Sequence, residues 1–222
     1  MTDLLIIIIL CYLAGSFPTG VIVGKVFKKT DIRDQGSGNT GATNAFRVLG
    51  AKAGFIVALI DLFKGFAATM FIAHLQWFSE PLLSSSWMFI ICTLVVVLGH
   101  IFPVFAGFKG GKGFGTAAGA VTGFLPVLAP FCLLFFLVML VFSGNVAFSA
   151  VFTSLFLPAC YYSLTLWTAV TFDPVIMGFF IFTFLLTFVM IRKKFFQYIR
   201  GEADLFTRIM IFRKRKENDE KK

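Results

Sequence analysis

Long apolar runs constrain this chain more than any other feature of its sequence. A helix needs about 20 residues to cross the hydrocarbon core of a bilayer, and runs of that order occur at 4–24, 53–73, 87–106, 150–170 and 175–191. With 58% apolar residues and 31 Phe among 222, the chain has too little polar surface to coat a water-soluble globule. The sequence therefore predicts an all-α, polytopic membrane protein.

A further apolar segment, residues 114–142, is too long for one ordinary span and is interrupted by Pro126 and Pro130. It is either one bent helix or a hairpin of two short helices. These alternatives place the C-terminal end of the chain on opposite sides of the membrane, so the distribution of basic residues distinguishes them.

Basic residues are concentrated in three segments. Of the 20 Lys and Arg, six lie in the loop 25–52, two lie in the loop 107–113 and eleven follow residue 191. Loops rich in Lys and Arg stay on the cytoplasmic side, which favours the hairpin because it puts all three segments there. We predict about seven transmembrane helices in one domain over residues 1–200, an N-terminus outside, and a basic cytoplasmic tail over residues 201–222.

The stretch "GSGNTGATNAFR", which starts at Gly36, combines glycines with amide, hydroxyl and guanidinium groups. It matches the dinucleotide pattern G-x-G-x-x-G but follows a basic loop rather than a β-strand, which argues against nucleotide binding. Glycines let backbone N–H groups approach an anion, and a helix that starts after the loop adds partial positive charge. We predict a phosphate-binding loop; the alternative is a polar turn that caps the next helix. The predicted contacts are Gly36, Ser37, Gly38, Asn39, Thr43, Asn44 and Arg47.

A second stretch, "GFKGGKGFG", starts at Gly107 and places two lysines among glycines. It is not a Walker A loop, because Gly113 stands where that motif has the hydroxyl that binds Mg²⁺. A flexible glycine run with two ammonium groups makes an anion site; the alternative is that the lysines extend to lipid headgroups. The predicted phosphate contacts are Lys109, Gly110, Gly111, Lys112 and Gly113.

Three segments of the chain resemble one family. "DIRDQGSGNTGATNAFRVLG", "DLFKG" and "GHIFPVFAGFKGGKGFGT" are similar to segments of the bacterial acyl-phosphate:glycerol-3-phosphate acyltransferases. The resemblance implies an enzyme of the bacterial inner membrane that transfers a fatty acyl group from acyl phosphate to the 1-hydroxyl of glycerol 3-phosphate. It also implies a monomer in contact with membrane lipid, an active site facing the cytoplasm, and no metal, cofactor or nucleic-acid partner.

The chain departs from this family near its C-terminal end. There the family pattern H-R-E-N-I-x-R-L-x-x-G aligns with "IRKKFFQYIRG", in which Ile191 replaces His and Lys194 replaces Asn.

The catalytic candidates are His100 and Ser37. An acyl phosphate is already an activated mixed anhydride, so positioning and charge stabilisation suffice and the protein need not supply a nucleophile. Either His100 or the substrate phosphate takes the proton of the attacking hydroxyl. The alternative role for His100 is structural, as a residue that bridges helix ends.

Two other classes of function fit parts of the sequence. An organophosphate transporter would also have a basic mouth, but transporters usually contain internal repeats, and the sequence shows none. Asp61 and Lys64, which lie inside a predicted span, share one helix face and are spaced to neutralise each other. A membrane anchor would explain the basic end "FRKRKENDEKK" but gives the glycine-rich stretches no role. The transporter is the second prediction.

Overall fold

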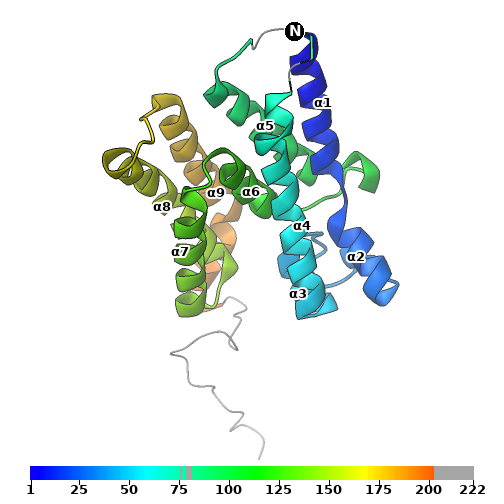
Figure 1. Ribbon diagram of the computed structural model, residues 1–222. Helices are drawn as coiled ribbons and strands as arrows, with labels where there is room; N and C mark the ends of the chain where they lie inside the picture. The colour runs from blue at the N-terminus through cyan, green and yellow to red at the C-terminus, as the bar shows by residue number, and fades with distance from the viewer. Residues whose placement is uncertain (76, 79–81, 203–222) are drawn as a thin grey trace, which may run out of the picture. The chain divides into compact units, whose positions relative to one another are not determined.

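A computed structural model describes residues 1–75, 77–78 and 82–202. Every regular element in these residues is a helix (Figure 1), which confirms the predicted fold class. The chain forms two compact units, residues 1–129 and 130–222. The single-domain organisation expected over residues 1–200 stays a prediction. The expected basic tail, apart from Gly201 and Glu202, lies outside the described residues.

The first predicted span consists of two helices rather than one. α1 covers Thr2–Ser16 and α2 covers Thr19–Lys28. Pro18 separates them, because its ring has no N–H to donate and it keeps the preceding residue, Phe17, in an extended conformation. The carbonyl oxygen of Phe17 therefore lies at a helix end, where groups outside α1 can reach it.

A short helix, α3 (Ala42–Leu49), follows the first glycine-rich loop and leads into the long helix α4 (Ala51–Met70). Gly50 alone separates the two, with a φ of +94° that side chains rarely allow, so the chain changes direction within one residue. One buried apolar cluster packs α2, the 3₁₀ turn Ile32–Asp34, α3 and α4 together. It consists of Val23, Ile32, Ala45, Leu49, Ala53 and Val57. This cluster anchors both ends of the loop.

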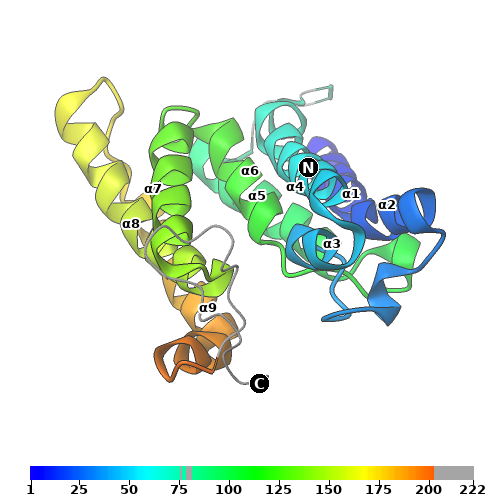
Figure 2. The ribbon, with the colours of Figure 1, turned by 90° about the horizontal axis from the view of Figure 1, so that it is seen from below.

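Close helix packing in the first unit depends on glycine. α5 covers Ser85–Ile101 and α6 covers Phe114–Phe124. A Cβ added at Gly15 of α1 would overlap the backbone of α5, and one added at Gly119 of α6 would overlap the backbone of α4. Small residues let membrane helices approach until their backbones touch. Figure 2 shows α1, α4, α5 and α6 lying together as a consequence.

Three further helices complete the described chain: α7 (Leu128–Ser143), α8 (Val146–Trp167) and α9 (Pro174–Ile199). The apolar segment 114–142 is thus two helices, α6 and α7, and the predicted break is confirmed. Pro126 lies in the break, while Pro130 lies in the first turn of α7, where no intrahelical N–H bond is needed.

A buried polar turn joins α7 to α8 in the second unit. The Oδ1 atom of Asn145 accepts a hydrogen bond from the backbone N–H of Phe148 (3.0 Å), which caps α8. The hydroxyl of Ser149 donates to the carbonyl oxygen of Asn145 (2.9 Å). Aromatic rings then hold α8 against α9, as where Phe148 stacks on Phe195 with 5.7 Å between ring centroids. Residues 143–149, "SGNVAFS", therefore form the turn and the capped first residues of α8.

Five helical segments in the described residues are long and apolar enough to cross a membrane, judged by length and composition. They are Thr2–Lys28, Ala51–His74, Ser85–Ala106, Val146–Trp167 and Pro174–Ile199. α7 is apolar but shorter. The chain is a multi-pass membrane protein, whereas the count of seven crossings and the orientation of the two termini stay predictions.

Candidate active site

Asn44 organises the first glycine-rich loop. Its side-chain nitrogen lies within 3.1 Å of the carbonyl oxygens of Ile32, Gln35 and Asn39, and its Oδ1 accepts the backbone N–H of Ser37 at 2.9 Å. Asn44 is buried, so this amide is committed to the loop itself. The sequence predicted that Asn44 contacts phosphate. In the structure, its amide holds the backbone of the loop that carries other predicted phosphate-binding residues.

The other predicted residues of this loop lie around that centre. Gly36 and Gly38 both have positive φ, and Gly36 lies so close to Asn44 that a Cβ there would overlap Oδ1 of the amide. The Oδ1 atom of Asn39 accepts the N–H of Gly41 (2.8 Å), immediately before α3 begins. The remaining three residues are exposed: Ser37 in the loop, and Thr43 and Arg47 on successive turns of α3. These three side chains therefore lie at the surface of the first unit.

The second glycine-rich loop folds back onto the end of α5. The N–H of Phe108 donates to the carbonyl oxygen of Pro103 (2.9 Å), while the N–H groups of Gly110 and Gly111 donate to those of Ile101 and His100 (both 3.1 Å). These glycine amides are therefore used within the protein. Gly113 has a φ of +80° and leads directly into α6.

The cationic side chains of this second loop differ in exposure. Lys109 is exposed and Lys112 is partly buried. The amides of Gly110 and Gly111 bind the end of α5, so these two backbone groups are not available to an anion.

Arg33 ties the two loops together. Its Nη1 donates to the carbonyl oxygen of Ala106 (2.7 Å), just before the second loop, and its Nη2 lies 2.7 Å from Oδ2 of Asp31. The hydrogen bonds from Arg33 lower the pKa of Asp31, and the carboxylate in turn raises the pKa of Arg33. The two predicted phosphate loops therefore meet at one end of the first unit. The sequence did not single out either residue.

A buried charged cluster lies beneath the loops. Oδ1 of Asp61 on α4 accepts hydrogen bonds from Nζ of Lys64 (3.0 Å) and Oγ1 of Thr19 (3.1 Å), and it lies 3.6 Å from Nδ1 of His100. Lys64 also donates to the carbonyl oxygen of Phe17 at the break between α1 and α2 (3.4 Å). The mutual neutralisation of Asp61 and Lys64 is confirmed. Their link to His100 was missed, because the spacing within one helix reveals nothing about its neighbours.

A small pocket opens onto this cluster. Its lining combines the break after α1, the first loop, α4 and the end of α5, and consists of Phe17, Pro18, Thr19, Gly20, Thr40, Asp61, Lys64, His100 and Pro103. A Cβ at Gly20 would overlap the carbonyl oxygen of Thr40, so the first loop rests directly on the start of α2. Of the predicted site residues, only His100 is part of this lining.

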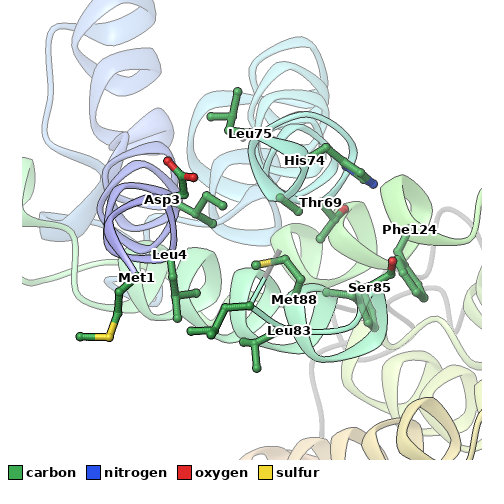
Figure 3. Close-up of a pocket in the computed structure, with 14 residues that line it drawn as sticks. Met1, Asp3, Leu4, Thr69, His74, Leu75, Leu83, Ser85, Met88 and Phe124 are labelled. Atoms are coloured by element: carbon green, nitrogen blue, oxygen red, sulfur yellow. The ribbon is translucent and has the colours of Figure 1, made fainter. Parts of the chain in front are cut away.

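A second pocket lies at the other end of the first unit (Figure 3). Its lining includes Asp3 of α1, Thr69 of α4 and Met88 of α5, together with His74 in the 3₁₀ turn Ile72–His74. Oδ2 of Asp3 accepts the N–H of Phe78 at 3.1 Å. The predicted phosphate contacts are not part of this lining, so the pocket is separate from the candidate active site.

These features define a class of protein: an integral membrane protein of packed helices, in which two cationic, glycine-rich loops lie side by side over a buried Asp–Lys–His cluster.

The family follows from comparison with known proteins. The glycerol-3-phosphate acyltransferase family model matches residues 5–201, and the chain belongs to this family. It is 44% identical over 153 residues to the glycerol-3-phosphate acyltransferase of Staphylococcus saprophyticus, covering 68% of this chain and 76% of that protein. The Streptococcus pneumoniae (strain Hungary19A-6) enzyme of the same name is 42% identical over 153 residues, or 68% of each chain.

Solved structures agree with the family assignment. The glycerol 3-phosphate form of PlsY (YgiH), an integral membrane glycerol 3-phosphate acyltransferase, has a TM-score of 0.73 and 30% identity, covering 91% of this chain and 95% of that one. Its lysophosphatidic acid form has a TM-score of 0.71 and 28% identity, covering 91% and 94%. The resemblance inferred from the sequence motifs is confirmed.

Proposed function

We propose that this protein transfers a fatty acyl group from acyl phosphate to the 1-hydroxyl of glycerol 3-phosphate, giving lysophosphatidic acid and inorganic phosphate. The observation that carries the proposal is the family match over residues 5–201. Relatives that cover two thirds or more of this chain are named glycerol-3-phosphate acyltransferases. The similar solved structure is described in forms with glycerol 3-phosphate and with lysophosphatidic acid, the substrate and product of this reaction.

The phosphate groups of the substrates bind to side chains of the two loops. Arg47 forks onto two phosphate oxygens, Ser37 and Thr43 donate hydroxyl hydrogen bonds, and Lys109 and Lys112 supply charge from the second loop. The exposure of Ser37, Thr43, Arg47 and Lys109 supports this assignment, as does the contact between Arg33 and Ala106 that brings the loops together. Asn44 and the glycines shape the loops.

The reaction needs no covalent intermediate on the protein. The 1-hydroxyl oxygen bonds to the acyl carbon, the bond from that carbon to the phosphate oxygen breaks, and the hydroxyl proton leaves on the phosphate. Ser37 and the cations stabilise the negative charge of the leaving phosphate. Two contacts of His100 support the phosphate rather than His100 as the proton acceptor: its Nδ1 lies 3.2 Å from Oγ1 of Thr116, and its Nε2 faces Gly111.

The proposed enzyme is a monomer in the bacterial inner membrane, with its active site facing the cytoplasm. The basic loops 25–52 and 107–113 support this orientation. Both substrates are phosphates that a cationic site recognises without a metal or cofactor. No structural observation favours the transporter, and the named relatives are acyltransferases.

Incubation of the purified protein with palmitoyl phosphate and labelled glycerol 3-phosphate tests the proposal. We expect labelled lysophosphatidate and release of inorganic phosphate in equal amounts. Palmitoyl-CoA, supplied in place of palmitoyl phosphate, should give no product, and glycerol should not replace glycerol 3-phosphate. Product formed from the CoA thioester alone would contradict the acyl-phosphate donor, and no product from either donor would contradict the acyltransferase.

A further inference from the structure

His100 is fixed on one side by the buried cluster. Its Nδ1 lies 3.2 Å from Oγ1 of Thr116 and 3.6 Å from Oδ1 of Asp61. That same carboxylate oxygen accepts hydrogen bonds from Lys64 and Thr19. Three groups, on α2, α4 and α6, therefore converge on one carboxylate–histidine pair, and His100 itself is only 6% exposed. The ring has little freedom to rotate.

The other side of the His100 ring supports the second glycine-rich loop. A Cβ placed on Gly111 would overlap Nε2 of the ring, and one placed on Gly110 would overlap the carbonyl oxygen of His100. The N–H of Gly111 also donates to that carbonyl oxygen at 3.1 Å. The loop therefore lies directly on His100, with no side chain between them.

A loop built of glycine needs such support. Glycine loses more conformational freedom on folding than any other residue, and this loop has few side chains of its own to pack. The imidazole ring occupies the space that side chains of the loop would otherwise fill. Fixing the ring therefore fixes the backbone that carries Lys109 and Lys112.

We propose that Asp61, Lys64 and His100 are positioning residues that hold the 107–113 loop, and with it Lys109 and Lys112, in the conformation that binds the phosphate of glycerol 3-phosphate. This inference rests on the proposed function. Charged pairs inside a membrane helix are expensive and are found mainly where they serve a site. Here Asp61, which is paired with Lys64, orients the ring on which the loop rests.

The positioning role differs in its kinetics from two other roles. If His100 positions the loop, its loss raises the KM for glycerol 3-phosphate more than it lowers kcat. If His100 is the general base, its loss lowers kcat at unchanged KM and removes one limb of the pH–rate profile. If the cluster only stabilises the fold, its loss lowers the melting temperature while the folded fraction keeps the wild-type KM.

A double-mutant cycle between Gly111 and His100 tests the contact directly. Gly111→Ala alone should raise the KM for glycerol 3-phosphate by roughly tenfold, because the added methyl group displaces the loop from the ring. In the His100→Ala background the ring is gone, so adding Gly111→Ala should change KM less than about twofold. The difference is a coupling of the size found for residues in contact. Gly178→Ala is the control, because a Cβ there has no atom within 4 Å.

Two further measurements keep the result decisive. If His100→Ala is not recovered folded, His100→Ser replaces it in the cycle, because it also removes the ring that the added methyl group of Gly111→Ala would meet. Binding is also measured as the rise in melting temperature that glycerol 3-phosphate causes. If wild-type protein shows this rise but makes no lysophosphatidate, the proposed function is contradicted. The coupling between Gly111 and His100 is then still measured, from the melting temperatures. Additive effects of the two substitutions, in KM and in the temperature shift, overturn the positioning role.

Discussion

Arg47 and Lys112 are the two cations most important to the proposed phosphate site. Arg47 is exposed on α3, one helical turn beyond Thr43, and Lys112 is partly buried in the second loop. A hydrogen bond to a charged group contributes about 1.5–3 kcal/mol. Arg47→Ala and Lys112→Ala should therefore each lower kcat/KM by roughly tenfold to 150-fold. Steady-state kinetics normalised to folded protein measures this.

Charge-preserving variants provide the matched controls. Arg47→Lys should recover only part of the loss, because an ammonium group does not reproduce the two-pronged guanidinium contact. If these residues only reach for lipid headgroups, Arg47→Lys and Lys112→Arg will both be silent, and the alanine variants will alter expression instead of turnover. Wild-type turnover in both alanine variants would contradict the phosphate site.

The Asp31–Arg33 pair should make the loop sensitive to acid. Because Arg33 lowers the pKa of Asp31, the charged carboxylate stabilises the fold above its unfolded pKa of about 3.9, and this stabilisation is lost as pH falls through the folded pKa. The pair is partly exposed, so its contribution is about 1 kcal/mol or less. We expect Asp31→Asn to lower the melting temperature slightly near neutral pH, and the difference from wild type to be smaller at about pH 3, below the unfolded pKa of Asp31. An equal difference at both pH values would refute this account.

Single residues also show where sequence reasoning stops. The motif placed Ser37, Asn44 and Arg47 in one phosphate-binding stretch, but the Asn44 side chain is buried and bonded to the loop backbone, whereas Ser37 and Arg47 are exposed. Asn has both donors and acceptors, so composition alone does not distinguish a ligand contact from a brace. The contact between His100 and Asp61 joins α5 to α4 across 39 positions of sequence, and no local pattern predicts it.

At the scale of helices, the contact between α4 and α6 depends on glycine. Cβ atoms at Gly65 and Gly119 would overlap the backbone of the opposite helix, so the two backbones touch. Gly119→Leu should force them apart and destabilise the fold by about 1–3 kcal/mol, as overpacking does. Thermal unfolding in detergent measures this. Gly178→Leu, at an exposed position of α9, is the control. Equal melting temperatures for the two variants would show that the α4–α6 contact tolerates a larger side chain.

The helix boundaries were partly predictable. The length of 114–142 and its two prolines were compatible with one bent helix or with a hairpin, and the distribution of basic residues correctly favoured two helices there. Pro18 had the same chemical effect between α1 and α2, but the run 4–24 had the length of one span, so nothing in its length required a break. At the break, Lys64 donates to the carbonyl oxygen of Phe17 and Thr19 donates to Asp61, contacts between segments that the sequence does not reveal.

At the scale of the whole molecule, the topology is open to direct test. The charge distribution predicts that the loop 107–113 faces the cytoplasm. Lys109→Cys, introduced after the four native cysteines are replaced, should react with a membrane-impermeant maleimide only when the membrane is opened. Thr2→Cys should react in intact cells, because Thr2 is exposed and the N-terminus is expected outside. Labelling of Lys109→Cys in intact cells would invert the predicted orientation.

The contact between the second loop and His100 also limits how this enzyme can change by mutation. Every single-base change in a glycine codon that alters the amino acid, other than to a stop codon, introduces a side chain. At Gly110 and Gly111 each such side chain begins with a Cβ that meets His100. An inhibitor that binds against this loop would therefore face few viable escape variants at these two codons, and resistance would have to arise from residues whose side chains are free to vary.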